Sequence, residues 1–332
     1  MASDSFKDAY AARGRGSMRL VTYQKNGGSA SLLGAMAADD GVIDLQERQR
    51  KRAGQERPEL SSMLALIEAG SAGLDRARAL AVGEGERLRI GLDVQLLAPL
   101  PLPPQIRDSM NFLGHLENAI DGRNKRNGVP ERTKQQRDRI EIFLRRPSWY
   151  KSNRFSVIGT GQEVVWPRYS TYADYEHELA CILWTGGKDI PVSEAEHHIF
   201  GYMNFNDLSA RDVQPDEMAQ CGPTKSKDFD GGNVFGPWIL TADEFDPKNA
   251  QMRSWVNGVL ANEGRMADMH YSFAEVIAYM SQDETLHPGE IIGSGTVAGG
   301  CRLEFGEQLN FGDTVEIETD GLGRLKVRIA ER

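Results

Sequence analysis

Hydrophobic and polar positions alternate in short segments along the first part of the chain after Met18. The alternation, with turn signals such as Asn26-Gly27, predicts three short strands, at 19–24, 31–37 and 41–45. Two helices are predicted next, at 60–69 and 74–81. Four prolines within 98–105 exclude a helix or a central strand, so we place a domain boundary there. The pattern predicts a small α/β N-terminal domain over 18–104, preceded by a flexible N-terminal extension over 1–17.

Strands prevail beyond residue 150. Period-two alternation and turn residues predict strands at 163–166, 175–184, 200–206, 234–240, 254–260 and 290–292, and a closing hairpin over 314–330. Helices are predicted there only at 192–198 and 273–281. Before them, the charged segment 122–146 predicts a loop followed by a solvated helix, which could act as a mobile cover. Because this order lacks the regular βαβ alternation of a doubly wound sheet, we expect an α+β fold with a β-rich domain over 105–332.

Composition narrows the class of protein. Hydrophobic residues make up 40% and charged residues 26% of the 332 positions, which is typical of a globular protein. A net charge of -9 disfavours nucleic acid as a partner, since phosphate binding needs a basic face. Cys181, Cys221 and Cys301 lack zinc-site spacing, and their odd number fits a disulfide framework poorly, so we expect a cytoplasmic protein. No apolar run approaches the roughly 18 residues of a spanning helix, and no membrane partner is expected.

Two glutamates share one face of the predicted strand 175–184. Alternation places Glu176 and Glu178 together, with His177 on the opposite face. Carboxylates held close together repel each other, and burial makes their ionisation costly, so such a pair usually needs a cation or water. An edge strand with a solvated acidic face explains the pair equally well.

A third carboxylate favours a metal site. Asp207 follows the apolar strand 200–206, at a strand end where sites are commonly built, and Arg211 and Asp212 lie in the polar turn after it. Beside the glutamate pair, Asp207 would complete an all-oxygen cage suited to Mg²⁺, Mn²⁺ or Ca²⁺ and poorly suited to zinc or copper. The alternative is that these residues only form the turn and its cap.

Five separated motifs resemble, in order and spacing, signatures of the fumarylacetoacetate hydrolase superfamily. They are Tyr-Glu-His-Glu-Leu-Ala at 175–180, Asn-Asp-Leu-Ser-Ala-Arg-Asp at 206–212, Gly-Pro-Thr-Lys-Ser-Lys-Asp-Phe at 222–229, Gly-Ser-Gly-Thr-Val at 293–297 and Phe-Gly-Asp at 311–313. The resemblance extends from Ile106 to the C-terminus. It implies a mixed β-sandwich roll in the larger domain and a homodimer. It also implies that Glu176, Glu178 and Asp207 bind one divalent cation, Mg²⁺ or Mn²⁺, with Ca²⁺ as a further possibility.

The resemblance to the longer members implies a fourth ligand and a catalytic pair. In those members an Asp lies seven residues before the catalytic His, a spacing matched here by Asp108 and His115. Imidazole changes charge near neutrality, which suits a base that takes a proton from water and later returns one. The orienting carboxylate is then Glu304. Shorter members have a Glu three residues after the His, where this sequence has Asn118, and Glu117 is one position off.

Substrate contacts are less firmly fixed by the same comparison. They are expected at Tyr150, Arg211, Gln214, Lys227 and Thr296. The alternative for Lys227 is a solvated charge run. Met110 replaces a tyrosine expected two residues after the metal-binding Asp, so we do not expect the superfamily's namesake substrate.

These residues predict a metal-dependent enzyme that hydrolyses a carbon–carbon bond in a small 1,3-diketo or 2,4-dioxo acid, with His115 activating water. A rival enzyme hypothesis is decarboxylation or tautomerisation of an oxo acid at the same metal site. A non-enzymatic role as a ligand-binding or scaffold protein predicts missing ligands or a missing base, whereas all of them are present in the sequence.

Overall fold

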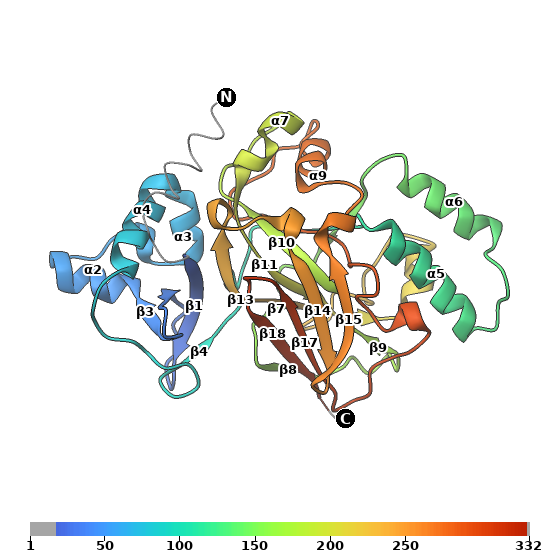
Figure 1. The fold of residues 1–332 in the computed structure, drawn as a ribbon, viewed down its shortest axis with the longest axis horizontal. Coiled ribbons are helices and arrows are strands. Elements are labelled where there is room, and N and C mark those ends of the chain that lie inside the picture. The colour runs from blue at the N-terminus through green and yellow to red at the C-terminus, as the bar shows by residue number, and fades with distance from the viewer. Residues whose placement is uncertain (1–17, 331–332) are drawn as a thin grey trace.

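Two β-sheets organise the protein (Figure 1). In the computed structural model, which describes residues 18–330, the larger sheet has eleven strands and the smaller has five. A separate two-stranded ladder joins β9 (Ala173–Asp174) to β12 (Ser209–Ala210). The strand-rich, mixed fold class predicted from the sequence is confirmed. The predicted extension over 1–17 lies outside the described residues.

The larger sheet joins the N-terminal segment to the rest of the chain. Its strands, in spatial order, are β3 (Val42–Asp44), β2 (Leu32–Met36), β1 (Arg19–Lys25), β13 (Asn233–Thr241), β11 (Ile199–Asp207), β10 (His177–Leu183), β16 (Ile291–Gly293), β5 (Ile106–Ser109) and β6 (Trp149–Ser152), with β4 (Val94–Leu96) on β1 and β7 (Val157–Ile158) on β13. β1 runs antiparallel to β13, with Arg19 opposite Leu240. The backbone hydrogen bonds of one sheet therefore cross the predicted domain boundary.

The smaller sheet contains the predicted C-terminal hairpin. In spatial order it consists of β15 (Val259–Arg265), β14 (Gln251–Val256), β17 (Thr314–Thr319), β18 (Arg324–Ile329) and β8 (Gln162–Val164). The prediction of one strand over 254–260 is wrong, because the chain reverses within it. Asn257 and Gly258 both have positive φ, 52° and 76°, and this is the conformation of a tight hairpin turn. Asn-Gly is a sequence signal for such a turn. It was overlooked because hydrophobic and polar residues continue to alternate on both sides of it.

The helices lie around the sheets. They are α2 (Leu45–Ala53), α3 (Met63–Glu68), α4 (Gly70–Ala81), α5 (Leu113–Arg126), α6 (Lys134–Phe143), α7 (Val192–Ala195), α8 (Gln214–Met218) and α9 (Phe273–Met280), with 3₁₀ turns at Pro58–Leu60, Glu196–His198, Ala242–Glu244, Pro247–Asn249, Met266–Asp268 and Leu303–Phe305. Figure 1 shows α2, α3 and α4 at one end of the molecule and α5 and α6 at the other. Within 18–330, no helix has both the length and the apolar character that a membrane span would need.

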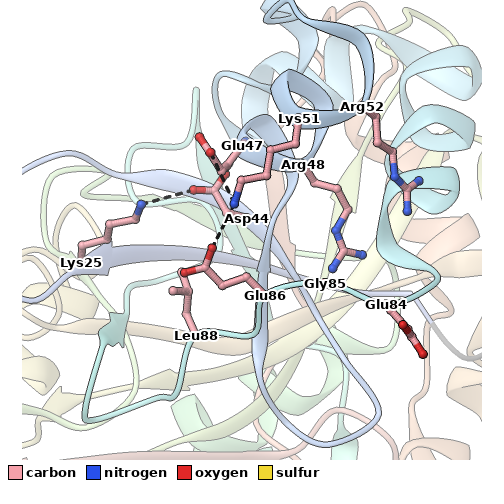
Figure 2. Close-up of a pocket in the computed structure, with 10 residues that line it drawn as sticks. All are labelled: Lys25, Asp44, Glu47, Arg48, Lys51, Arg52, Glu84, Gly85, Glu86 and Leu88. Atoms are coloured by element: carbon pink, nitrogen blue, oxygen red, sulfur yellow. Dashed lines mark hydrogen bonds and ion pairs between the residues drawn. The ribbon is translucent and has the colours of Figure 1, made fainter.

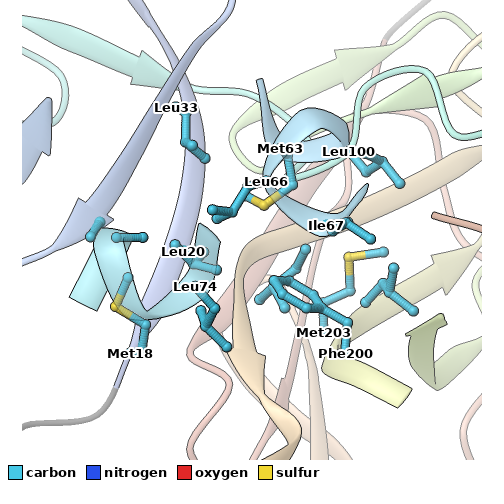
Figure 3. Close-up of a cluster of buried hydrophobic side chains, with 14 of the residues drawn as sticks. Met18, Leu20, Leu33, Met63, Leu66, Ile67, Leu74, Leu100, Phe200 and Met203 are labelled. Carbon is cyan, nitrogen blue, oxygen red and sulfur yellow. The ribbon is translucent and has the colours of Figure 1, made fainter. Parts of the chain in front are cut away.

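A continuous hydrophobic core also crosses the predicted boundary (Figure 3). Leu66 and Ile67 of α3 pack in one cluster with Leu20 of β1 and with Phe200 and Met203 of β11. All five side chains are buried, and burial of a large apolar side chain stabilises a fold by about 1.5–3 kcal/mol. The N-terminal segment thus stabilises the strands that carry the carboxylates described below.

Helix α5 corrects the prediction for segment 122–146. Gly122 was expected in a loop, but it lies inside α5, and the predicted solvated helix begins only at Lys134. A Cβ on Gly122 would lie 2.0 Å from the carbonyl oxygen of Leu303 and 2.7 Å from the carbonyl carbon of Glu304. Glycine is therefore required at this point because the backbone of 303–304 approaches the helix, and not because the chain turns there.

Candidate metal centre and catalytic pair

Neighbouring strands of the larger sheet carry the predicted acidic residues to one place. β10, which carries Glu178, lies between β11, which ends at Asp207, and β16. β16 in turn pairs with β5, and its Gly293 lies opposite Asp108 in the register. Glu176 immediately precedes β10. Residues from four separate stretches of sequence meet here because strand order brings them side by side.

Three of these carboxylates form a compact buried cluster. Asp108, Glu178 and Asp207 each offer an oxygen that lies within 4.8 Å of the others, and each side chain is nearly inaccessible. Oδ1 of Asp108 and Oδ1 of Asp207 accept no hydrogen bond from any described residue. A Cβ on Gly293 would lie 2.5 Å from Oδ1 of Asp108 and 2.9 Å from Oε2 of Glu178, so the glycine keeps this space open. The donor set fits a hard divalent cation.

Electrostatics supports the same conclusion. Burial, followed by the neighbouring acidic groups, raises the pKa of Glu178 well above its ordinary value. Burial also raises the pKa of Asp207 well above its ordinary value, although the positive charge of Lys227 opposes this effect. Burial also raises the pKa of Asp108. Three carboxylates so close together cannot all ionise without a compensating positive charge. The alternative of a solvated acidic face does not apply to Glu176 and Glu178, because both side chains are buried.

Glu176 faces basic side chains instead of the cluster of three. Its Oε1 lies 2.8 Å from Nη1 of Arg211, and its Oε2 accepts from Nζ of Lys227. Burial alone would raise the pKa of Glu176, but Arg211 and Lys227 lower it below its ordinary value. Lys227 also contacts Asp207, and it donates to Oγ of Ser209 at 2.6 Å. Glu176 therefore lies beside the cluster, already ionised and ion-paired.

Lys227 is a buried ammonium and does not belong to a solvated charge run. Burial lowers the pKa of Lys227, but Asp207 and Glu176 outweigh this effect and raise it above the ordinary value. The side chain therefore keeps its positive charge. The Lys227 ammonium contacts the carboxylates of both Glu176 and Asp207.

His115 and Glu304 form a hydrogen-bonded pair beside the carboxylates. Nδ1 of His115, in the first turns of α5, lies 2.7 Å from Oε1 of Glu304. The other Glu304 oxygen accepts from the backbone N–H of Gly299 at 2.6 Å and from the side-chain amide of Asn118 at 2.9 Å. Nε2 of His115 lies 3.7 Å from Oε1 of Glu176. The carboxylate thus fixes one ring nitrogen and leaves the other directed toward the acidic site.

The rival orienting residue lies elsewhere. Oε1 of Glu117 accepts from Nη1 of Arg132 at 3.1 Å, in a partly exposed ion pair. Cys301 lies close to the His115–Glu304 pair, with Sγ 3.7 Å from Oε1 of Glu304. His115, Cys301 and Glu304 form a second cluster of possible metal ligands, but two of its members are already hydrogen-bonded to each other.

The remaining predicted contacts line the same region. The hydroxyl of Tyr150, on β6, donates to Oδ2 of Asp207 at 2.8 Å. Thr296 lies 3.4 Å from Oε1 of Glu178, and the backbone N–H of Gly295 donates to Oε2 of Glu178 at 2.8 Å. Oε1 of Gln214, at the start of α8, accepts from Nη1 of Arg211 at 3.2 Å.

Asp174 is a residue that sequence reasoning missed. Its Oδ2 accepts from Nε of Arg211 at 2.8 Å, and its carboxylate also accepts from the backbone N–H groups of Arg302 and Leu303 at 2.8 and 3.0 Å. Asp174 therefore ties Arg211 to the backbone that carries Glu304. Alternation could have indicated it, because Asp174 lies two residues before Glu176 and so shares its face.

Arg123 was also missed, because it lies in the charged segment that was attributed to a solvated surface. Nη2 of Arg123 donates to Oε1 of Gln214 at 3.2 Å. Burial, together with the charges of Arg211 and Arg139, lowers the pKa of Arg123 to about 10. A run of arginines in sequence gave no signal that Arg123 would contact Gln214.

A cavity of about 170 Å³ is lined only by residues of the N-terminal segment, between Lys25 and Leu88 (Figure 2). Acidic and basic side chains both line it, and several already form pairs. Lys25 lies 3.7 Å from Asp44, and Lys51 lies 3.1 Å from Glu86. Because these charges largely neutralise one another and no predicted catalytic residue is present, we place the functional site at the buried carboxylates.

The fold and the site together define a class of protein, a strand-rich enzyme fold whose buried carboxylates are grouped for a divalent cation beside a His–Glu pair. The chain belongs to the fumarylacetoacetate hydrolase family, since residues 106–330 match the family model described as fumarylacetoacetate (FAA) hydrolase C-terminal. The resemblance inferred from the five motifs is confirmed.

Proteins named for different activities resemble this chain in sequence or in fold. Mitochondrial oxaloacetate tautomerase of Xenopus laevis is 29% identical over 317 residues, covering 93% of this chain and 89% of the relative. An uncharacterized protein of Archaeoglobus fulgidus is 31% identical over 71% of this chain and 84% of its own length. The solved fumarylacetoacetate hydrolase of Exiguobacterium antarcticum is 25% identical, with a TM-score of 0.73, covering 95% of this chain and all of the other. The solved maleylpyruvate hydrolase of Sphingobium shares the fold, with a TM-score of 0.70 and 23% identity. The match covers 95% of this chain and 100% of the other.

Proposed function

We propose that the protein uses one divalent cation to hydrolyse a carbon–carbon bond in a small 1,3-diketo or 2,4-dioxo acid. The observation that supports this most directly is the 2.7 Å contact between His115 and Glu304 beside the carboxylate cluster. A cation alone would be enough to polarise an oxo acid, whereas a hydrolase also needs a base that can activate water.

The cation would be held by Asp108, Glu178 and Asp207, with Glu176 as a fourth, adjacent carboxylate. When bound, it would polarise the substrate carbonyl and stabilise the negative charge of the departing enolate. We expect Mg²⁺ or Mn²⁺, since all four donors are oxygens, and Ca²⁺ is a further possibility.

The residues of the chain would move the protons. With its Nδ1–H donated to Glu304, His115 presents the lone pair of Nε2 and can take a proton from water. The resulting hydroxide adds to the carbonyl carbon, the adjacent carbon–carbon bond breaks, and the leaving enolate carbon takes a proton back from the imidazolium. Lys227 and Gln214 would hold the substrate carboxylate or the oxyanion, since Lys227 contacts Asp207 and Gln214 contacts Arg211.

A screen tests this proposal directly. The purified protein, supplemented with Mg²⁺ or Mn²⁺, is given a series of acylpyruvates, and loss of the diketone absorbance is followed in the ultraviolet. In water labelled with oxygen-18, hydrolysis places one labelled atom in the new carboxylate product. Absence of turnover across the series, or turnover without incorporation of the label, would contradict the proposal.

Tautomerisation of an oxo acid is the second candidate, and one relative supports it. The Xenopus laevis oxaloacetate tautomerase matches 93% of this chain. Such a reaction needs the same carboxylates and a proton carrier, but no attacking water. Accelerated decay of the enol form of oxaloacetate, with no cleavage of acylpyruvates, would favour this candidate over hydrolysis.

A further inference from the structure

A buried cysteine lies beside the His115–Glu304 pair and takes no part in the proposed reaction. Sγ of Cys301 lies 3.7 Å from Oε1 of Glu304, the same oxygen that lies 2.7 Å from Nδ1 of His115. Possible ligand atoms of the three side chains all lie within 4.8 Å of one another, and all three side chains are buried. An imidazole, a thiol and a carboxylate therefore converge on one small volume.

Two segments that are far apart in the sequence bring these side chains together. His115 lies in the first turn of α5, whereas Cys301 and Glu304 lie three residues apart, around a 3₁₀ turn. Gly122, two turns further along α5, allows the backbone of 303–304 to approach the helix, because a Cβ there would lie 2.7 Å from the carbonyl carbon of Glu304. The close approach that positions Glu304 against His115 thus also positions Cys301.

The donor set of this second cluster differs from that of the three carboxylates. Nitrogen, sulfur and oxygen donors together suit Zn²⁺, whereas Mg²⁺ and Ca²⁺ prefer oxygen donors alone. Zinc bonds of about 2.3 Å to sulfur and about 2.0–2.2 Å to nitrogen and oxygen place the ligand atoms of a tetrahedral site roughly 3.4–3.6 Å apart. The distance between Sγ of Cys301 and Oε1 of Glu304 is already close to this value, and Nδ1 of His115 would withdraw from Oε1 by only about 0.7 Å.

A zinc ion in this cluster would change the protonation of two ligands. Burial raises the pKa of the Cys301 thiol well above its ordinary value, so the metal-free thiol is neutral, and a coordinating metal removes its proton. The thiol proton passes to solvent, and the Nδ1 proton of His115 moves to Nε2, so that the neutral ring binds the metal through Nδ1. An Nε2 that already carries a proton cannot accept another from water.

We propose that His115, Cys301 and Glu304 form a second metal site, which takes Zn²⁺ and thereby inhibits the enzyme. The inhibition, although not the site itself, rests on the proposed function, because it assumes that Nε2 of His115 is the base. The second cluster shares no ligand with the cluster of three carboxylates. Zinc inhibition should therefore persist when Mg²⁺ is raised to saturation.

Cobalt spectroscopy tests the site without any turnover. Co²⁺ accepts the same donors as zinc, and a thiolate ligand gives it a charge-transfer band in the near ultraviolet that oxygen ligands do not give. The full chain is saturated with Mg²⁺ and then titrated with Co²⁺. We expect this band in the wild-type protein and its loss in both Cys301→Ser and Cys301→Ala, with circular dichroism to establish that each variant is folded. Absence of the band in the wild type, or its retention in a folded Cys301 variant, would overturn the inference.

Inhibition by zinc tests the consequence for catalysis. At saturating Mg²⁺, added Zn²⁺ should lower kcat for the acylpyruvate identified by the screen, and more Mg²⁺ should not restore it. Cys301→Ser should need about tenfold or more Zn²⁺ for half inhibition, because a hydroxyl is a much weaker ligand for zinc than a thiolate. Inhibition that Mg²⁺ relieves, or that is equally strong in Cys301→Ser, would place the inhibitory zinc at the carboxylates and overturn the inference.

The other two cysteines provide matched controls. Cys181→Ser changes a second buried thiol, and Cys221→Ser changes an exposed one. Both variants should keep the cobalt band and the zinc sensitivity of the wild type, and loss of the band in either would contradict the assignment to Cys301. A band that depends on Cys301, in a protein that cleaves no acylpyruvate, would refute the hydrolase proposal and leave the second metal site standing.

Discussion

Oε1 of Glu304 lies 2.7 Å from Nδ1 of His115, although 189 positions separate the two residues in the sequence. Two further donors, the backbone N–H of Gly299 and the side-chain amide of Asn118, hold the second oxygen of the same carboxylate. The glutamate is thus fixed from both sides, and its orientation sets the direction in which the imidazole ring points.

Glu304→Gln should lower kcat by about 100-fold or more, the typical contribution of general acid–base catalysis. An amide has only one acceptor oxygen, so it cannot accept from His115 on one side and from Gly299 and Asn118 on the other. Glu117→Gln is the matched control, because Glu117 only pairs with Arg132 near the surface. Steady-state kinetics on the acylpyruvate identified by the screen gives kcat for both variants, and circular dichroism establishes that each is folded. Equal losses in the two variants would remove Glu304 from the mechanism.

Asp108→Asn should abolish metal-dependent stabilisation without destabilising the metal-free protein. In the wild-type chain, cation at 100 times its Kd should add about 2.7 kcal/mol to the free energy of unfolding. Without cation, the variant should be as stable as the wild type or more stable, because it removes one of three mutually repelling buried carboxylates. Thermal unfolding with Mg²⁺, with Mn²⁺ and with a chelator measures both effects. Asp230→Asn, at an exposed aspartate, should respond to metal as the wild type does; a metal response in Asp108→Asn as large as in the wild type would contradict the assignment.

Gly122→Ala should impair the site although alanine favours helices more than glycine does. The added methyl group would lie 2.0 Å from the carbonyl oxygen of Leu303, so α5 or the 303–304 backbone must shift. We expect a loss of about 1 to 3 kcal/mol in the free energy of unfolding, as for other overpacked positions, and a lower kcat because His115 and Glu304 separate. Gly114→Ala is a milder comparison in the same helix, since its methyl group would only approach Ala298 at 3.1 Å. Denaturant unfolding measures the stability of both variants, and steady-state kinetics measures their kcat. A fully active Gly122→Ala would show that activity does not require the close approach of the 303–304 backbone to α5.

The sequence predicted strands and acidic residues better than it predicted contacts between distant segments. Period-two alternation was enough to place Glu176 and Glu178 on one face, because a strand fixes that relation locally. Whether that face met water or other carboxylates depended on the order of β5, β16, β10 and β11 in the sheet, which no local pattern encodes. The roles of Asp108 and His115 were predicted only from the resemblance to the family. A family motif reflects which residues meet in the folded protein, even when they lie far apart in the sequence.

Errors arose where one residue type serves two purposes. Glycine usually indicates a loop, yet Gly122 lies inside α5 because a backbone segment passes close to it. Arginines in a charged run usually indicate a solvated helix, yet Arg123 donates a hydrogen bond to Gln214 of α8. In both cases the deciding contact comes from a part of the chain far away in sequence.

The charge of Glu217 stabilises the loop that carries Lys227, so the stability of this loop should depend on pH. Its carboxylate accepts four hydrogen bonds, from the backbone N–H and the hydroxyl of both Thr224 and Ser226. Partial burial raises the pKa of Glu217, but these hydrogen bonds outweigh it and hold the pKa below the ordinary value of 4.5. A carboxyl group with a lowered pKa in the folded state stabilises the fold fully above its unfolded pKa, and this stabilisation is lost as the pH falls through the folded value.

Glu217→Gln should therefore lower the free energy of unfolding by about 1 kcal/mol at neutral pH, at the low end for bonds to a charged group because solvent reaches the side chain. The difference from the wild type should begin to shrink as the pH falls below 4.5, and it should vanish below the lowered pKa of the folded state, where the wild-type carboxylate is protonated. Urea unfolding at pH 7 and at a series of acidic values measures this difference. Asp216→Asn is the control, because Asp216 is an exposed neighbour whose carboxylate accepts no hydrogen bond from the described residues, and it should change stability little at any pH. A Glu217→Gln deficit that stays constant from neutral to acidic pH would mean that the side chain stabilises the loop by packing and not through its charge.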